Sequence, residues 1–174
     1  PEKKVNGISI VTSPYNQFEN PLYSNNKIIG TYVNSIMALH DAIERGSDEA
    51  LLLDSNENIS EGSGENLFIV KDEELITPTP DNCLNGITRQ SIIKIAQDEN
   101  IDVIEKKLKY EDLVDADEAF FTGTAVEVTP ISKVDETTIG DSMIGPITKK
   151  LQKIFTDTVT NKNKKYAHWL DPIN

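Results

Sequence analysis

The sequence predicts a single α/β domain. Short apolar runs, such as 50–53 and 67–70, are bounded by turn-forming residues, which is typical of buried strands. Other segments, such as 33–43 and 146–159, carry apolar residues at helical spacing. The chain has 174 residues, the length of one domain with a sizeable core. We therefore expect strands and helices mixed within one folded unit.

The amino-acid composition limits which ligands and macromolecules the protein is expected to bind. The formal net charge of −12 argues against nucleic acid and anionic membranes, since both repel an acidic surface. Only Arg45 and Arg89 are arginines among the 17 basic residues, so phosphate clamps built from arginine are nearly unavailable. The single cysteine, Cys83, excludes an internal disulfide, and without a Cys/His cluster no metal site is predicted. No signal-peptide-like segment or long apolar span occurs, so a cytoplasmic location is expected.

The first part of the chain carries a candidate lysine. A strand is expected over 7–12. The sequence begins at Pro1 without an initiator methionine, which indicates a piece of a longer protein. A polar loop over 13–26 leads to Lys27, at the junction with a helix that ends at Gly46. The apolar face of this helix is expected to hold Val33, Ile36, Met37, His40 and Ile43, with His40 packed in the core. On its own, Lys27 reads as a solvated surface charge.

An acidic glycine run follows the strand 49–53. It reads Glu61-Gly62-Ser63-Gly64-Glu65 and precedes the strands 67–70 and 75–77. The glycines let a bulky group approach the main chain. The two acids are either surface charges on a glycine loop, or one of them faces a bound cation or protonated heterocycle, because a buried carboxylate requires such a partner. The run alone leaves both interpretations open.

The second half offers two candidate anion sites. Residues 84–90 open a helix with Thr88 as its expected N-cap, and the amides at its start can bind an anion or remain empty. After a strand at 101–104 and a helical piece at 111–114, a longer strand breaks at Gly123 and is expected to resume. The break would expose the backbone amides of 124–126. The last helix begins at Pro146, and the tail 166–172 is expected to form a packed arm.

These separate elements suit one ligand. Pyridoxal phosphate requires a lysine amine, a carboxylate for its ring nitrogen and donors for its phosphate. The motifs and their order resemble fold-type IV (class IV) aminotransferases, and most closely the branched-chain amino-acid aminotransferases. The matching motifs are Lys27 with Gly30 and Tyr32, the run 59–68, Leu84-Asn85-Gly86-Ile87-Thr88-Arg89, the run 121–130 and the tail Trp169-Leu170-Asp171-Pro172-Ile173-Asn174.

The resemblance implies a role for each matching residue. Lys27 would form the Schiff base with the cofactor and carry the proton between substrate Cα and cofactor C4′. Tyr32 would donate to the phenolic oxygen of the cofactor, and Glu61 would keep its ring nitrogen protonated. Glu65 is given only a supporting role.

The resemblance also assigns the two candidate anion sites. Both would contribute to the phosphate site, and the second would also lie near the substrate. The amides of Ile87 and Thr88, together with Thr124, would hold the phosphate. The amides of Ala125 and Val126 would lie near the substrate carboxylate. The resemblance also implies that the mixed sheet curls into a barrel-like shape with the helices outside, as in the C-terminal domain of D-amino-acid aminotransferase-like proteins.

Two departures from the family pattern stand out. Ile28 and Ile29 are bulkier than the residues that usually follow the lysine, which bears on substrate preference. Family members also have a smaller N-terminal domain, which supplies a phosphate-binding arginine and one wall of the substrate pocket. Residues 1–174 are therefore expected to be the single cofactor-binding C-terminal domain, inactive alone, of an enzyme that forms a homodimer or larger homo-oligomer.

The expected activity is transamination between branched-chain L-amino acids and 2-oxoglutarate. The nearest alternatives are D-amino-acid transamination and aminodeoxychorismate lyase activity. A further alternative, from another class, is a non-catalytic domain that retains the fold.

Overall fold

The computed structural model describes residues 3–18 and 26–171. Strands and helices are mixed along this part of the chain, as the sequence predicts. The elements are α1 (Lys3–Asn6), β1 (Ile8–Thr12), η1 (Ile29–Thr31), α3 (Tyr32–Glu44), β2 (Glu49–Leu53), β3 (Ile59–Gly62), β4 (Asn66–Lys71), β5 (Glu74–Thr77), α4 (Ile87–Asp98), β6 (Val103–Glu105), α5 (Tyr110–Val114), β7 (Glu118–Gly123), β8 (Glu127–Val134), β9 (Thr137–Thr138), α6 (Pro146–Val159) and η2 (Lys164–Trp169).

One mixed sheet organises the domain. Its strand order is β3-β2-β1-β8-β7-β4-β5-β6, with β9 paired to β8. β1 lies between β2 and β8 and pairs in parallel with both, whereas β7 is antiparallel to β8 and β4. The sheet curls until its edges meet, because Ile59 of β3 forms a bridge with Leu108, just beyond β6. The expectation of a curled mixed sheet is therefore confirmed.

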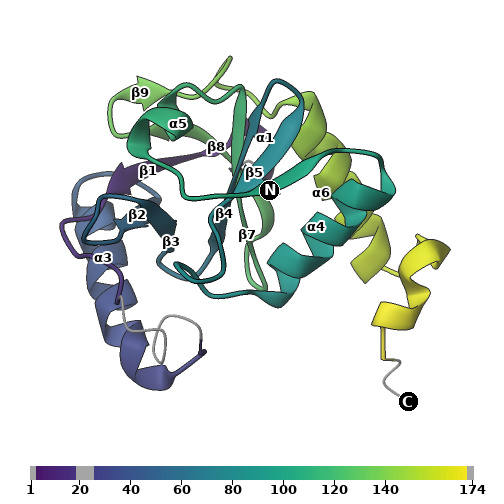
Figure 1. The fold of residues 1–174 in the computed structure, drawn as a ribbon, viewed down its shortest axis with the longest axis horizontal. Helices are drawn as coiled ribbons and strands as arrows, with labels where there is room; N and C mark the ends of the chain where they lie inside the picture. The colour runs from purple at the N-terminus through teal and green to yellow at the C-terminus, as the bar shows by residue number, and fades with distance from the viewer. Residues whose placement is uncertain (1–2, 19–25, 172–174) are drawn as a thin grey trace.

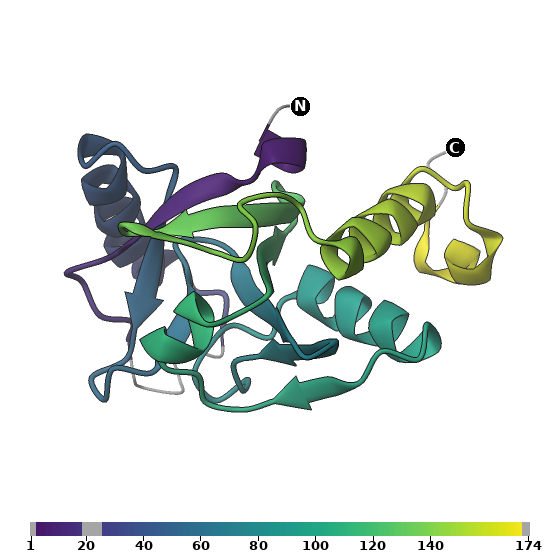
Figure 2. The same cartoon turned by 90° about the horizontal axis from the view of Figure 1, so that it is seen from above.

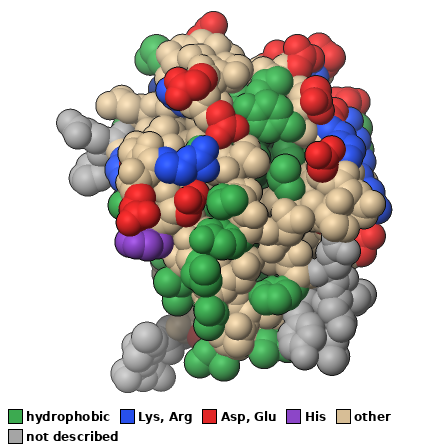
Figure 3. Space-filling view, turned by 90° about the vertical axis from the view of Figure 1, so that its left-hand side faces the viewer, with side chains coloured by type: hydrophobic (Ala, Val, Ile, Leu, Met, Phe, Trp, Pro, Cys, Tyr) green, Lys and Arg blue, Asp and Glu red, His purple; other side chains and the backbone are tan. Residues whose placement is uncertain are grey.

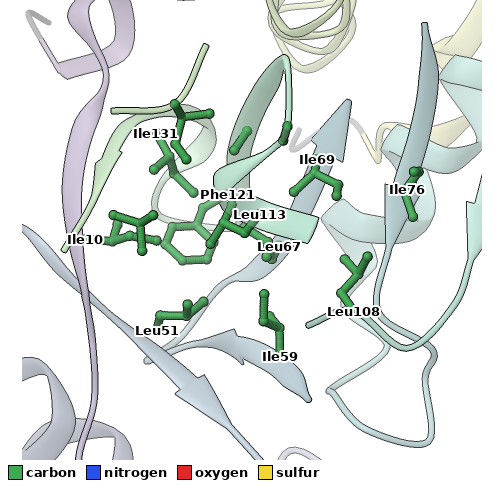
Figure 4. Close-up of a cluster of buried hydrophobic side chains, with 14 of the residues drawn as sticks. Ile10, Leu51, Ile59, Leu67, Ile69, Ile76, Leu108, Leu113, Phe121 and Ile131 are labelled. Atoms are coloured by element: carbon green, nitrogen blue, oxygen red, sulfur yellow. The ribbon is translucent and has the colours of Figure 1, made fainter. Parts of the chain in front are cut away.

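The inside of the curled sheet is filled by apolar side chains. Ile10, Leu51, Leu67 and Phe121 come from four different strands and converge on one cluster (Figure 4). All four are fully buried. Successive side chains of a strand point to opposite faces, so Phe68 and Phe120, which are next to Leu67 and Phe121, face outward. Their rings stack beneath the helices with centroids 5.1 Å apart.

The helices lie outside the sheet on two sides (Figures 1 and 2). α4 and α6 cover the outward face through a second apolar cluster that includes Ile92, Leu151 and Phe155. α3 covers β1 and β2 on the other side. Of the predicted packed arm, Tyr166 in η2 is buried and donates to Asp98 at 3.0 Å, whereas residues 167–169 are exposed and Pro172 lies outside the described residues. No helix within the described ranges is long and apolar enough to cross a membrane.

α3 presents its large apolar side chains to solvent, contrary to the predicted core face. Ala38 and Ala42 are its fully buried residues and pack against β1 and β2. Val33, Ile36, Met37 and Ile43 are between 47% and 64% exposed and contribute to the apolar face seen in Figure 3. The prediction that His40 packs in the core is wrong, because His40 is exposed and pairs with Glu44 at 3.4 Å. Close approach of the helix to the sheet requires small residues, so the alanines form the contact.

Candidate active site

Four segments meet at one end of the curled sheet. They are the β3–β4 turn, the approach to α3, the start of α4 and the β7–β8 turn (Figure 1). Together they line two adjoining cavities of about 60 Å³ and about 250 Å³. Both cavities are lined by Lys27, Gly64, Asn66 and Leu84. The structure therefore brings together residues that lie far apart in the sequence.

The smaller cavity holds three of the predicted site residues. Lys27, Tyr32 and Glu61 all line it. Lys27 precedes η1, is exposed, and forms no ion pair with the described residues. Tyr32 begins α3 and is 37% exposed. An accessible amine, a phenol and a carboxylate thus face one space.

The β3–β4 turn depends on a close approach at Gly62. The Gly62 amide donates to the Glu65 carbonyl at 2.7 Å, which closes the turn. A β-carbon at Gly62 would lie 2.9 Å from Glu65 Oε2 and 3.0 Å from the Phe121 ring. A larger residue here would have to displace the Glu65 carboxylate and the Phe121 ring, so the close approach that the sequence pattern indicated is present. β3 itself reaches into the acidic glycine run, which was not predicted.

The Glu61 carboxylate is held by three donors. It accepts hydrogen bonds from the Gln17 side chain, from the Leu84 amide at 3.0 Å and from Asn66 Nδ2 at 3.5 Å. Burial nevertheless raises the pKa of Glu61 to about 7, against the Leu84 and Gln17 hydrogen bonds, which lower it. Of the two interpretations left open by the sequence, the structure therefore favours a buried carboxylate facing a cavity.

Glu65 belongs to a second acidic group under the same turn. Burial, together with the neighbouring Glu49 carboxylate, raises the pKa of Glu65 to about 8. Glu49 is itself buried and accepts hydrogen bonds from the Ala50 amide at 2.7 Å and the Ser63 amide at 3.2 Å. Near neutral pH, Glu65 is therefore mainly protonated and adds little negative charge to the cavity.

The raised pKa values of Glu61 and Glu65 predict a pH-dependent stability. Their ordinary value is 4.5, so the folded chain binds more protons than the unfolded chain between that pH and about 8. The free energy of unfolding is therefore expected to fall as pH rises from 5 to 8, by up to about 1.4 kcal/mol per pKa unit for each group. Urea unfolding at several pH values checks this.

Two variants isolate the contribution of Glu65. Glu65→Gln should make the decline shallower, while Glu136→Gln, at an exposed carboxylate, should leave it unchanged. Stability that rises over this pH range, or equal slopes in all three proteins, would contradict the assignment.

The larger cavity contains the start of α4. Ile87, Thr88 and Thr124 line it, together with the shared residues. The prediction that Thr88 is the N-cap is wrong, because the N-cap is Gly86, and no side chain caps this helix end. Thr88 instead lies inside the first turn with a mostly buried side chain. The uncapped amides remain available to an anion, which the helix dipole favours.

The second predicted anion site is a hairpin turn. The chain reverses over residues 124–126, so that β8 pairs antiparallel with β7 and Gly123 lies opposite Glu127. The expected break at Gly123 and the strand that resumes after it are therefore confirmed, and the resumed strand runs antiparallel to the first. Thr124 faces the larger cavity, whereas Ala125 and Val126 line neither cavity. The substrate-carboxylate role of these two residues stays a prediction.

Neither arginine contributes to these cavities. Arg45 pairs with Asp41 at 3.2 Å and donates to the Thr12 carbonyl. Arg89 lies in the first turn of α4, where it is buried and donates to Glu105 and to the Pro78 carbonyl. Among the described residues, Lys27 is therefore the basic side chain that both cavities share.

Comparison with known proteins identifies the family. Residues 1–134 match the family model described as Amino-transferase class IV. The chain belongs to this family. The predicted resemblance to class IV aminotransferases is thus confirmed.

Individual class IV aminotransferases match over nearly the whole chain. The branched-chain-amino-acid aminotransferase of Pseudomonas aeruginosa is 45% identical over 164 residues, covering 94% of this chain and 53% of that protein. The crystal structure of the T.th. branched-chain amino acid aminotransferase with N-(5′-phosphopyridoxyl)-L-glutamate has a TM-score of 0.95 and 39% identity, covering 97% of this chain and 57% of that one. The enzyme from Thermoproteus uzoniensis with norvaline has a TM-score of 0.92 and 41% identity, covering 98% and 57%. The chain therefore spans about half the length of the relatives it matches.

Sequence reasoning gave no individual role to three residues of this candidate site. Gln17 lies in a loop without a recognisable sequence pattern, so nothing in the sequence indicated its contact with Glu61. Glu49 begins a strand, and its proximity to Glu65 arises only from sheet pairing. Asn66 carried a signal, because it is a polar residue between a glycine turn and a buried apolar strand.

Proposed function

We propose that residues 1–174 form the cofactor-binding domain of a pyridoxal-phosphate-dependent branched-chain amino-acid aminotransferase. The observation that carries this proposal is the pair of joined cavities, with Lys27 and Glu61 in one and the free amides of α4 in the other. The named relatives support the substrate class, since those reported above are branched-chain aminotransferases.

The residues present fit pyridoxal phosphate at each of its ends. The aldehyde requires an accessible amine, and Lys27 is exposed in the cavity. The ring nitrogen requires a carboxylate, and Glu61 lines the cavity, where Gln17 and Leu84 donate hydrogen bonds to it. The phosphate requires donors, and the uncapped start of α4 offers them beside Thr124. The phosphopyridoxyl compound in the T.th. structure supports this choice of cofactor.

Each residue has a separate task in the proposed transamination. When bound, the cofactor supplies an electron sink for the bond that breaks at substrate Cα. Glu61 holds a proton at the ring nitrogen, and its own hydrogen bonds keep the carboxylate aimed. Lys27 Nζ would hold the cofactor, and once the substrate amine has displaced it, the freed Lys27 amine would move the proton from substrate Cα to C4′. Tyr32 donates to the phenolic oxygen and orients the ring.

The proposed active enzyme includes a further N-terminal domain. The phosphate carries up to two negative charges, whereas Arg45 and Arg89 are committed to other partners. A cation from outside this chain is therefore proposed to complete the phosphate site and close one wall of the substrate pocket. Alone, the domain is expected to bind the cofactor weakly and to be inactive.

We also propose that the full-length enzyme is a homo-oligomer, with a cytoplasmic location as predicted from the sequence. The exposed apolar face of α3 supports self-association, because solvent exposure of Val33, Ile36, Met37 and Ile43 together is costly in a free monomer. Asp41 is the acidic residue within 33–43, and it is paired with Arg45. No unpaired carboxylate within 33–43 therefore opposes the association of two copies of this acidic chain.

A comparison of two preparations tests the proposed function. The full-length protein should transfer the amino group from leucine, isoleucine and valine to 2-oxoglutarate, and should sediment as a dimer or larger species. The 174-residue chain should unfold cooperatively in urea but show no measurable transfer. Preferential use of D-amino acids, or lyase activity on aminodeoxychorismate, would replace the substrate assignment. Full activity of the short chain would refute the need for a further domain.

A further inference from the structure

Asn66 connects two parts of the candidate site that belong to different elements. It is the first residue of β4 and only 5% exposed. Its Nδ2 donates to the Leu84 carbonyl at 2.6 Å and to Glu61 Oε2 at 3.5 Å. Leu84 in turn donates its backbone amide to Glu61 Oε2 at 3.0 Å. The segment at Leu84 is thus attached to Glu61 both directly and through Asn66.

The contact between Asn66 and Gly86 shows how tightly this segment is held. A β-carbon at Gly86 would lie 2.4 Å from Asn66 Oδ1 and 3.6 Å from Asn66 Cγ. Gly86 has φ −63° and ψ 147°, a conformation open to alanine, so the obstacle to a methyl group is the Asn66 side chain. Gly86 is also the N-cap of α4. Asn66 therefore contacts the chain where the helix begins.

A rigid ligand makes the spacing between its two binding sites important. Glu61 lies on β3, whereas the free amides belong to α4, and residues 84–86 connect the two regions. Asn66 lines both cavities. We propose that Asn66 is a positioning residue, which sets the separation between the ring-nitrogen site at Glu61 and the phosphate site at the start of α4. This inference rests on the function proposed above, which assigns those two sites.

A positioning role has a distinctive consequence for binding. A ligand that spans both sites benefits from their correct separation, whereas a fragment that occupies one site does not. Loss of Asn66 should therefore weaken an intact phosphopyridoxyl compound more than it weakens either half. A merely structural role would affect the fold, or all ligands alike.

Binding of three probes to the 174-residue chain tests this difference. NMR titrations would use pyridoxamine 5′-phosphate, pyridoxamine and inorganic phosphate. Asn66→Ala should weaken the intact compound about tenfold or more, and each half less than about twofold. The matched control is Asn58→Ala, since Asn58 is similarly buried and bonded to Asp54 but lines neither cavity. It should cost stability in urea without changing the three affinities.

Gly86→Ala provides an independent variant. In the native background its methyl group should displace Asn66 and weaken the intact compound as Asn66→Ala does. In the Asn66→Ala background it should have no further effect, because the obstructing Oδ1 and Cγ atoms are gone. Additive losses in the double variant would contradict the proposed contact.

A measurement without ligand decides the inference even if the chain binds none of the probes. Titration of Glu61 should shift the amide resonances of Ile87 and Thr88, and Glu61→Gln should abolish this response. Asn66→Ala should reduce it strongly, whereas Asn58→Ala should retain it. Failure of the wild-type chain to bind any probe would count against the proposed function. Identical behaviour of the Asn66 and Asn58 variants would overturn the positioning role.

Discussion

Replacement of Lys27 by alanine is expected to abolish transamination by the full-length enzyme, with a loss of about a thousandfold or more. The reason is that Lys27 is the amine that both cavities share, and the Arg45 and Arg89 side chains are held elsewhere. Lys27→Arg should be equally inactive, because its guanidinium stays protonated and cannot act as a nucleophile or base. Steady-state assays with leucine and 2-oxoglutarate measure both losses.

Chemical labelling gives a direct check on the role of Lys27. Borohydride reduction of the cofactor-loaded enzyme, followed by peptide mapping, should place the label on Lys27. The matched control is Lys149→Ala, an exposed lysine on α6 that lines neither cavity and should retain full activity and labelling. A label on another lysine would remove Lys27 from the mechanism.

Glu61→Gln is expected to lower turnover about ten- to a hundredfold in the same enzyme, with a smaller effect on cofactor affinity. A hydrogen bond to a charged group contributes about 1.5–3 kcal/mol, and a protonated ring nitrogen matters most when negative charge develops on the ring. The amide of glutamine keeps the size of the side chain but cannot hold the proton at that nitrogen. Turnover and cofactor titrations, measured side by side, separate the two effects.

Glu65→Gln is the informative control for Glu61. It changes the other acid of the same turn, whose raised pKa, caused by burial and by Glu49, already makes it mainly neutral near pH 7. Glutamine should therefore replace it with little loss of turnover. If the two substitutions were equally harmful, or if Glu61→Gln had no effect, Glu61 would not be the partner of the ring nitrogen.

Most of the fold could be predicted from local patterns. Apolar runs such as Leu67–Val70 became buried strands because their length and turn boundaries suit no other element. α3 shows the limit of periodicity. Its spacing correctly predicts a helix, but Ala38 and Ala42 face the sheet while Ile36 and Met37 face solvent. Periodicity identifies an apolar side of a helix, and only tertiary packing determines which side meets the core.

The site was predictable where chemistry follows from residue type. A lysine, a carboxylate on a glycine turn and a free helix start were identified as candidates, and they line adjoining cavities. The contacts that hold them were not predictable. Gln17 reaches Glu61 from a loop without regular structure, and Asn66 reaches Leu84 across the cavity wall. Such contacts depend on how the elements pack and leave no periodic trace in the sequence.

The central position of β1 has a consequence for synthesis on the ribosome. On one side of β1, Ile10 pairs with Glu49 of β2. On the other side, Ile8 pairs with Ile131 of β8, which is synthesised much later. Pairings so distant in sequence are slow to form, and until β8 emerges the second edge of β1 stays open to the wrong partners. The Thr124 turn is made just before β8, so the proposed phosphate site also forms late. Nascent chains should therefore gain the cofactor site only after most of the domain has been translated.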